Sequence, residues 1–333
     1  MTIDFLSFKN DWLSREKHFS SFTNGPLLNF WQQRQECHFE GADGVPIKYV
    51  KFTSSAHQRA IVVVTGRTEG YIKYQELAYD LFRCGYDIWI LDHRGQGFSG
   101  RILEDSQRGH VEKFDDYVDD FEFFWLNIFV QQNYQKAFLL AHSMGGAIAA
   151  LFLARHPQSV LAAALCSPML GIALPMPTWL ARKITDLTER WQSAREYYAV
   201  GTGRWLPLPY AVNLLTHSKA RYRLFSRHYS DKPEIRLGGP TYHWVRESMM
   251  AGERAIQLAP QITTPLILLQ ASQDRLVDNE AHAAFCQALA DAGHPCEGGV
   301  PKMIKGARHE ILFEHDVLRT EALIDILSFF AQY

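Results

Sequence analysis

The stretch Leu140-Ala-His-Ser-Met-Gly-Gly146 decides the fold of this chain. It joins an apolar run, Lys136-Ala-Phe-Leu-Leu140, to a segment rich in small residues that ends near Arg155. A short continuous apolar run is typical of a fully buried strand, and the segment after it has the length and composition of a helix. The sequence therefore predicts a strand that passes into a helix through a tight turn at Ser143.

The side chains around Ser143 suit such a turn. A sharp strand-to-helix bend requires small residues two positions before and two positions after its centre, and Ala141 and Gly145 occupy these positions. The Ser143 hydroxyl is then expected to project above the sheet, in an A-x-S-x-G variant of the nucleophile elbow, with the positive end of the helix dipole directed at it. The alternative interpretation is that Ser143 is an ordinary helix N-cap.

The same alternation of strands and helices extends along most of the chain. Buried strands are predicted at 60–64, 87–91, 136–140, 160–165, 265–270 and 299–304, and helices at 74–84, 114–130, 143–155, 279–291 and 317–333. Alternating runs at 37–40 and 47–52 predict an antiparallel hairpin before them. Because continuous apolar strands that alternate with helices form parallel sheets covered on both faces, we predict an α/β fold with right-handed crossovers.

Three regions are predicted within the chain. Residues 1–32 are expected to form an N-terminal arm that wraps the domain, and residues 33–168 and 252–333 the α/β core. Residues 169–251, where Pro-rich and aromatic-rich segments replace the alternation, are expected to be an insertion. Residues 176–240 of this insertion contain 11 Lys or Arg and 5 Asp or Glu, although the whole chain has a formal net charge of −2. The insertion is therefore predicted to be locally basic.

Composition excludes several classes of protein. A chain of 333 residues with 47% hydrophobic and 21% charged residues is neither disordered nor a short disulfide-stapled scaffold. Its near-neutral charge gives no general case for nucleic-acid binding. No apolar window approaches the roughly 20 residues of a membrane-spanning helix, and no signal peptide is recognisable. The odd number of scattered cysteines predicts a reducing compartment and no zinc site; they are Cys37, Cys84, Cys166, Cys286 and Cys296.

A serine hydroxyl needs an imidazole to accept its proton and a carboxylate to orient that imidazole. Among the 14 histidines, His309 has the best position, because it follows the last predicted strand on a loop at the carboxyl edge of the sheet. His142 is adjacent to Ser143 but is expected to point elsewhere on the turn. His93, beside Asp92, is the next candidate, but it precedes the serine, whereas the chain order in this architecture is serine, acid, histidine.

The loop after the strand at 265–270 offers two candidate acids, Asp274 and Asp278. Asp274 is preferred because it lies closer to the end of the strand, whereas Asp278 stands where a carboxylate would cap the next helix. The reversed assignment remains an alternative. The oxyanion of the reaction is expected to accept hydrogen bonds from the backbone N–H of Met144 and from that of Arg67, in the loop after the strand at 60–64.

Five segments together resemble the monoacylglycerol lipase and lysophospholipase branch of the α/β-hydrolases, and within it the bacterial lysophospholipases of the L-two type: Thr65-Gly-Arg-Thr-Glu-Gly70, Leu91-Asp-His-Arg-Gly-Gln-Gly-Phe-Ser-Gly100, Ala141-His-Ser-Met-Gly-Gly146, Ser272-Gln-Asp-Arg-Leu-Val-Asp278 and Gly306-Ala-Arg-His309. The similarity continues into the insertion, at 201–205 and 238–247. Two departures are Ala141, where the wider family usually has Gly, and Thr65-Gly66, where it usually has His-Gly.

The resemblance implies an α/β-hydrolase fold, with a mostly parallel eight-stranded sheet flanked by helices and a helical lid inserted after the sixth strand. It also implies a catalytic triad of Ser143, Asp274 and His309, and release of a fatty acid from a lipid with one acyl chain. No metal or organic cofactor is expected. The expected location is the cytoplasmic side, either soluble or attached to the inner membrane as a peripheral protein, and not secreted.

The insertion is expected to select the substrate. Its apolar stretches at 169–174 and 211–215 can line an acyl tunnel, and its arginines suit phosphate or an anionic membrane surface. Arg204, Arg221 and Arg223 are the candidate head-group contacts. These features predict hydrolysis of the acyl ester of lysophospholipids through an acyl-serine intermediate, with acyl transfer to lipid alcohols as a side activity.

Three alternatives remain. If the arginines only solvate a small tryptophan-rich lid core, the protein is a monoacylglycerol lipase or a general carboxylesterase. A second alternative, from another class, is a non-catalytic hydrolase fold that binds lipid. Peptidases share the scaffold, but their lids usually provide acidic residues for the amino terminus of the substrate, and this insertion is basic.

Overall fold

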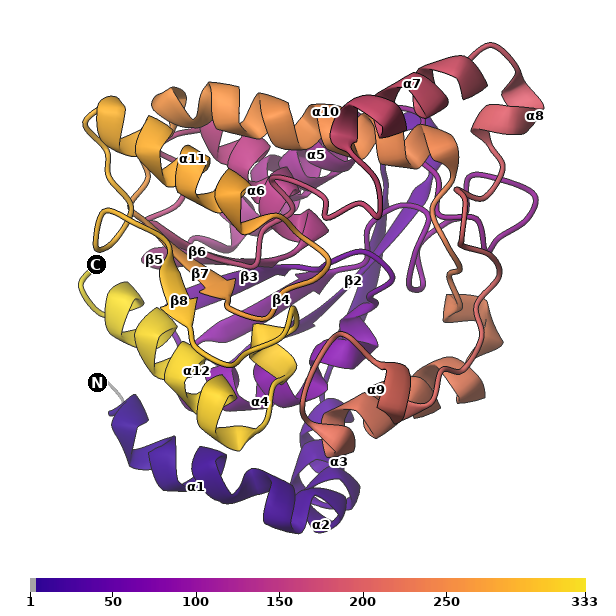
Figure 1. The fold of residues 1–333 in the computed structure, drawn as a ribbon. Helices are drawn as coiled ribbons and strands as arrows, with labels where there is room; N and C mark the ends of the chain where they lie inside the picture. The colour runs from indigo at the N-terminus through magenta and orange to yellow at the C-terminus, as the bar shows by residue number, and fades with distance from the viewer. Residues whose placement is uncertain (1–3) are drawn as a thin grey trace.

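The computed structural model describes residues 4–333 and contains one mixed sheet with helices on both faces (Figure 1). The strand order is β1-β2-β4-β3-β5-β6-β7-β8. The strands are β1 (Gln35–Glu40), β2 (Pro46–Phe52), β3 (Arg59–Val64), β4 (Asp87–Leu91), β5 (Lys136–His142), β6 (Ala162–Cys166), β7 (Leu266–Ala271) and β8 (Lys302–Ile304). The hairpin β1–β2 and the pair β2–β4 are antiparallel, and the other neighbours are parallel. The predicted α/β-hydrolase fold is confirmed.

Both faces of the sheet are buried. Successive side chains of each strand point to opposite faces, so each strand contributes to two apolar clusters. Val62 and Trp89 belong to one apolar cluster, whereas Ile61 and Ile88 belong to the other. The first cluster lies under helices α5 (Phe114–Phe124), α6 (Met144–Arg155), α10 (Tyr242–Leu258) and α11 (Asn279–Asp291), and the second lies under α4 (Gln75–Arg83) and α12 (Asp316–Phe330).

Strand register brings the loops of the site to one edge of the sheet. Val64 pairs with Ala141, and Ala141 pairs with Leu165, so β3, β5 and β6 end side by side. On the other half of the sheet, Ala271 at the end of β7 pairs with Ile304 at the end of β8. The four loops that follow β3, β5, β7 and β8 therefore leave the sheet at the same carboxyl edge, where the candidate residues are expected.

The N-terminal arm is more regular than expected. Its described part forms the short helices α1 (Lys9–Ser14), α2 (Phe19–Asn24) and α3 (Pro26–Trp31), which lie against the α4 and α12 side of the molecule (Figure 1). Trp12 and Leu27 are almost completely buried. Residues 1–3 of the expected arm lie outside the described residues. Helices this short do not show a periodic apolar pattern, so they could not be predicted from apolar spacing.

The chain between β6 and β7 carries α7 (Thr178–Thr188), α8 (Gln192–Arg195), α9 (Lys219–Asp231) and α10. Figure 1 shows α8 and α9 beyond the sheet on one side, whereas α10 returns across the layer that contains α5 and α11. The predicted end of the insertion, residue 251, falls inside α10, whose Trp244 and Ala255 join the core cluster with α6. Within residues 4–333, the helices are too short or too polar for any of them to span a bilayer.

Candidate active site

Ser143 occupies the tight turn between β5 and α6. Its backbone has φ 53° and ψ −120°, a conformation that a non-glycine residue adopts only when its surroundings enforce it. A Cβ on Gly145 would lie 2.2 Å from the carbonyl oxygen of Val64, so only glycine lets α6 approach β3 this closely. The Ser143 side chain makes no helix-capping hydrogen bond, in contrast to the N-cap alternative.

A chain of hydrogen bonds connects the Ser143 hydroxyl to a buried carboxylate. His309 Nε2 lies 2.9 Å from Ser143 Oγ, and His309 Nδ1 lies 2.8 Å from Asp274 Oδ2. The other carboxylate oxygen, Oδ1, accepts hydrogen bonds from the amides of Leu276 at 2.9 Å and Val277 at 3.2 Å. Burial alone would raise the pKa of Asp274, but His309 and the two amides hold that pKa below its usual value. The carboxylate is therefore charged and keeps the imidazole oriented, while Ser143 stays partly exposed.

The competing candidates lie elsewhere. The Asp278 side chain accepts a hydrogen bond of 2.9 Å from the amide of Glu280 and caps α11. His93 is buried, and its Nε2 lies 3.2 Å from the carbonyl oxygen of Thr65. Burial lowers the pKa of His93 to about 4, so this ring is neutral at physiological pH. The structure therefore brings His309, rather than His93, to Ser143.

The loop after β3 is held from two sides. Gln96 Nε2 donates to the carbonyl oxygen of Gly66 at 2.7 Å and to that of Glu69 at 2.9 Å. The Gly66 amide donates to the Glu69 carboxylate at 2.5 Å. Between these anchors, the amide of Arg67 makes no hydrogen bond to another described residue, and the same is true of the Met144 amide at the start of α6. Both N–H groups therefore remain free to donate to an oxyanion.

A buried polar cluster lies beneath the turn and was missed by the sequence analysis. The Glu69 carboxylate accepts hydrogen bonds from Lys73 Nζ at 2.6 Å and Tyr74 Oη at 2.5 Å, and it lies 3.3 Å from His142 Nδ1. Burial would raise the pKa of Glu69, but Lys73 and His142 hold it well below its usual value. The spacing of Glu69 and Lys73, four residues apart, was the only sign in the sequence.

The cluster also reaches the loop of the candidate base. Lys73 Nζ contacts Oε1 of Glu310 at 2.5 Å, and Glu310 directly follows His309 in the chain. His142 Nε2 lies 3.3 Å from the carbonyl oxygen of His309. The loop after β3 is thus connected to the loop after β8 through buried charges and hydrogen bonds, so the polar cluster positions both the Arg67 amide and the His309 ring.

The prediction that Arg221 contacts a head group is wrong. Arg221 is buried, its Nε and Nη2 donate to Glu76 at 2.7 and 2.8 Å, and its Nη2 also contacts Asp316 at 2.9 Å. Its charge is therefore used inside the protein to join α9 to α4 and α12. Arg204 is exposed and pairs with Asp105 at 3.0 Å, and Arg223 is exposed beside the N-terminal arm.

The two apolar stretches expected to line an acyl tunnel differ in their surroundings. Met169 and Leu170 are buried in the main core cluster. By contrast, the stretch at 211–215 lies next to the loop of His309, because the Leu215 carbonyl accepts a hydrogen bond of 2.9 Å from the Glu310 amide. The second stretch therefore borders the loop that carries the candidate base, whereas the first contacts the candidate nucleophile, because the Met169 amide donates to the Ser143 carbonyl oxygen at 2.9 Å.

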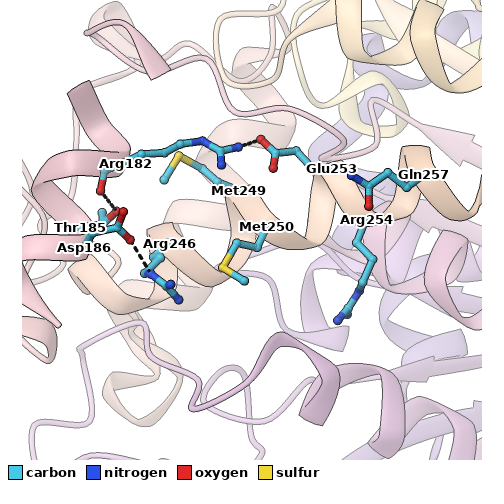
Figure 2. Close-up of a pocket in the computed structure, with 9 residues that line it drawn as sticks. All are labelled: Arg182, Thr185, Asp186, Arg246, Met249, Met250, Glu253, Arg254 and Gln257. Carbon is cyan, nitrogen blue, oxygen red and sulfur yellow. Dashed lines mark hydrogen bonds and ion pairs between the residues drawn. The ribbon is translucent and has the colours of Figure 1, made fainter. Parts of the chain in front are cut away.

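A cavity of about 440 Å³ lies between α7 and α10 (Figure 2). Met249 and Met250 contribute to its wall, and an ion pair between Arg246 and Asp186, at 2.9 Å, crosses it. None of the residues of the Ser143 site lines it. Among residues 4–333, no three His, Cys, Asp or Glu side chains are grouped to hold a metal ion, and the five cysteines are free thiols.

Comparisons with known proteins show the family of the chain. The family model described as "Serine aminopeptidase, S33" matches residues 55–316. The chain is 52% identical to "Lysophospholipase L2" of Escherichia coli (strain K12), over 98% of this chain and 96% of that protein. It is 28% identical to "Monoglyceride lipase" of Rattus norvegicus, over 82% of each chain.

Solved structures show the same fold. The structure of the Paleococcus ferrophilus monoacylglycerol lipase superposes with a TM-score of 0.65 at 19% identity, over 86% of this chain and 98% of that one. Because the family model covers most of the chain and the E. coli relative nearly all of it, the chain belongs to the serine aminopeptidase S33 family of α/β-hydrolases.

Proposed function

We propose that the protein is a serine hydrolase that cleaves the fatty-acyl ester of a lysophospholipid and releases a free fatty acid and a glycerophosphodiester. The observation that carries this proposal is the continuous hydrogen-bonded chain from Ser143 through His309 to Asp274, beside two free amides. The 52% identity to the E. coli lysophospholipase supports the choice of substrate. The protein is thus a carboxylic ester hydrolase.

The geometry supports a two-step reaction. His309 Nε2 takes the proton from Ser143 Oγ as this oxygen attacks the ester carbonyl, and the amides of Met144 and Arg67 donate to the resulting oxyanion. His309 then gives the proton to the departing glycerol oxygen, which leaves an acyl-Ser143 ester. Water attacks this ester with His309 as the base, the fatty acid leaves, and the serine is restored. Asp274 stays charged throughout and stabilises the imidazolium.

The insertion at 169–251 acts in this proposal as a lid that contacts a membrane surface. It carries Arg and Lys side chains together with many exposed apolar ones, and this combination suits an anionic bilayer as seen in other interfacial proteins. The exposed apolar residues are Trp179, Leu187, Trp191, Tyr197, Val200, Leu206, Leu208, Val212, Leu214 and Met250. A peripheral position on the cytoplasmic face would give the site direct access to lipids with a single acyl chain.

Hydrolysis of monoacylglycerol is the second candidate function, and the similarity to the rat monoglyceride lipase favours it. The same acyl-Ser143 intermediate would allow transfer to a lipid alcohol in place of water. A purely lipid-binding role is disfavoured, because a non-catalytic fold would have no need of a hydrogen-bonded Ser143, His309 and Asp274. The basic insertion disfavours an aminopeptidase, which must bind a positively charged amino terminus.

The test compares two lipid esters that carry the same acyl chain with one short-chain ester. Wild-type protein and Ser143→Ala are assayed on palmitoyl lysophosphatidylethanolamine, monopalmitoylglycerol and a short-chain p-nitrophenyl ester. We expect the wild type to release fatty acid fastest from the lysophospholipid and the variant to release none from any of them. Cleavage of the short ester alone by the wild type would leave an esterase and refute the lipid substrate.

A further inference from the structure

The side chain of Arg67 is a half-buried cation without a counter-ion. Its Nη2 donates to the carbonyl oxygen of Gly238 at 2.7 Å, and its guanidinium lies over the ring of Trp244, 5.0 Å from the centroid. Its Nε is buried and has no acceptor. No carboxylate among residues 4–333 lies within ion-pair distance of it. Burial lowers the pKa of Arg67 only to about 10, so the group keeps its charge at neutral pH.

The arginines that are more deeply buried than Arg67 each have a carboxylate partner. These pairs are Arg15 with Asp80 at 3.0 Å, Arg94 with Asp120 at 2.7 Å, Arg221 with Glu76 at 2.7 Å and Arg319 with Asp80 at 2.8 Å. Half-buried arginines without one, such as Arg101 and Arg236, donate at least two hydrogen bonds, whereas Arg67 donates one. A charge taken out of water is destabilising unless an opposite charge compensates it. Among the described residues, no opposite charge compensates Arg67. Its Nη1 makes no hydrogen bond and remains accessible to solvent.

The distance between the Arg67 guanidinium and the reacting ester is limited by the length of the arginine side chain. Its amide is the proposed oxyanion donor, and an extended arginine places the guanidinium about 6–7 Å from its own backbone. In a lysophospholipid, six covalent bonds separate the ester carbonyl carbon from phosphorus, a reach of about 6–7 Å when extended. In a monoacylglycerol, a neutral hydroxyl stands in place of the phosphate.

The guanidinium lies at the boundary between core and insertion. A Cβ on Gly109 would lie 2.3 Å from Arg67 Nη2, and Gly238 and Trp244 contact the guanidinium from the insertion side. The absence of a side chain at Gly109 is what leaves room for this group. We infer that the Arg67 side chain binds the phosphate of the lysophospholipid, in the role assigned from sequence to Arg204, Arg221 and Arg223.

This inference rests on the proposed function, and it makes Arg67 a determinant of head-group selectivity. A guanidinium forms strong charge-assisted hydrogen bonds with phosphate oxygens, and Nη1 is free to donate one. The competing explanation is structural: through Gly238 and Trp244, Arg67 would only fasten the insertion to the core. A structural role would lower the rates of all substrates together, whereas a phosphate contact changes their ratio.

The experiment measures that ratio in neutral detergent micelles. The kcat/KM of palmitoyl lysophosphatidylethanolamine is divided by that of monopalmitoylglycerol for the wild type, Arg67→Gln, Arg67→Lys and Arg190→Gln. Arg190 is an exposed arginine of the same insertion and controls for the loss of one positive charge. We expect the ratio to fall roughly 10- to 100-fold in Arg67→Gln, to fall less in Arg67→Lys, which keeps a point charge, and to change less than about twofold in Arg190→Gln.

A second measurement keeps the inference testable if Arg67→Gln folds poorly. Glycerol 3-phosphate, with glycerol as its uncharged control, is tested as a competitive inhibitor of short-ester hydrolysis. We expect the phosphate to inhibit the wild type and to lose potency in Arg67→Lys. An unchanged ratio in Arg67→Gln, or an equal fall in Arg190→Gln, would overturn the inference. If the wild type cleaves only monopalmitoylglycerol, the proposed function fails on its own, and the inhibition by glycerol 3-phosphate still decides whether Arg67 binds phosphate.

Discussion

Replacing Glu69 with glutamine probes the polar cluster under the active site. The carboxylate accepts hydrogen bonds from the Gly66 amide, Lys73 Nζ and Tyr74 Oη, and it contacts His142. Glutamine has nearly the same shape, but it carries no charge. Its amide nitrogen would face hydrogen-bond donors, and it cannot accept hydrogen bonds from them. The change therefore removes the negative centre of the cluster without creating a cavity.

The expected loss follows from what Lys73 retains. Removing one partner of a buried ion pair typically destabilises a protein by about 3–5 kcal/mol. Lys73 keeps Glu310 at 2.5 Å in this variant, so we expect the lower end, about 3 kcal/mol of unfolding free energy. The Gly66 amide also loses its charged acceptor, one residue before the proposed oxyanion donor. Because displacement of a catalytic group by about 1 Å can slow a reaction on the order of 100-fold, we expect kcat to fall roughly 10- to 100-fold.

Denaturant unfolding and steady-state kinetics of Glu69→Gln provide the assay. Glu321→Gln, which removes an exposed carboxylate from α12, is the matched control. The double variant Glu69→Gln/Glu310→Gln leaves Lys73 without a carboxylate, so its loss of stability should exceed the sum of the two single losses by about 1 kcal/mol or more. A Glu69→Gln protein that is as stable and as active as Glu321→Gln would refute the positioning role of the cluster.

Three further predictions concern the turn, the acid and the pH dependence of stability. Asp274→Asn should lower kcat on the order of 10⁴-fold with the fold intact, whereas Asp278→Asn should cost only about 1 kcal/mol of stability; similar kinetics for both would show that the acid is misassigned. Gly145→Val should destabilise the protein by about 1–3 kcal/mol or more and abolish labelling of the serine by a fluorophosphonate, because even its Cβ would overlap the Val64 carbonyl. Burial raises the pKa of Asp92 from 3.8 to about 7, so its contribution to stability is fully present below pH 3.8 and is lost as the pH rises through 7. Between about pH 5 and pH 8 the wild type should lose about 3 kcal/mol of unfolding free energy relative to Asp92→Asn, and parallel pH profiles of the two proteins would contradict this.

Elements with strong local signals could be predicted from the sequence. The bounds of β4 and α11 agree with the prediction, because β4 is a continuous apolar run and α11 begins at an aspartate cap and ends before a glycine with positive φ. β8 starts later than predicted, at Lys302, since Gly298 and Gly299 both have φ 75° and form a turn. α5 ends at Phe124, and a wider π-helical turn continues it to Phe129, which a pattern of apolar spacing does not distinguish from α-helix.

Some features of the candidate site depend on residues close in the sequence, and others depend on residues far apart in the sequence. The turn at Ser143 is local, because small residues at fixed positions are visible in the sequence. The placement of Arg221 was wrong because its counter-ions, Glu76 and Asp316, come from α4 and α12, and no local pattern connects them to α9. Lys73 and Glu310, which are also in contact, lie even farther apart in the sequence. Three-dimensional packing alone decides which charges of such clusters are used inside the protein and which remain for a ligand.

The acyl-enzyme itself provides the most direct test of the proposed reaction. Wild-type protein is mixed with palmitoyl lysophosphatidylethanolamine, quenched in acid during turnover and digested, and the peptides are analysed by mass spectrometry. The mechanism predicts a palmitoyl ester on the peptide that contains Ser143, at Ser143 itself. Two results would contradict it. One is that a His309→Ala protein releases palmitate without forming such an adduct. The other is an adduct at any other residue of the wild type.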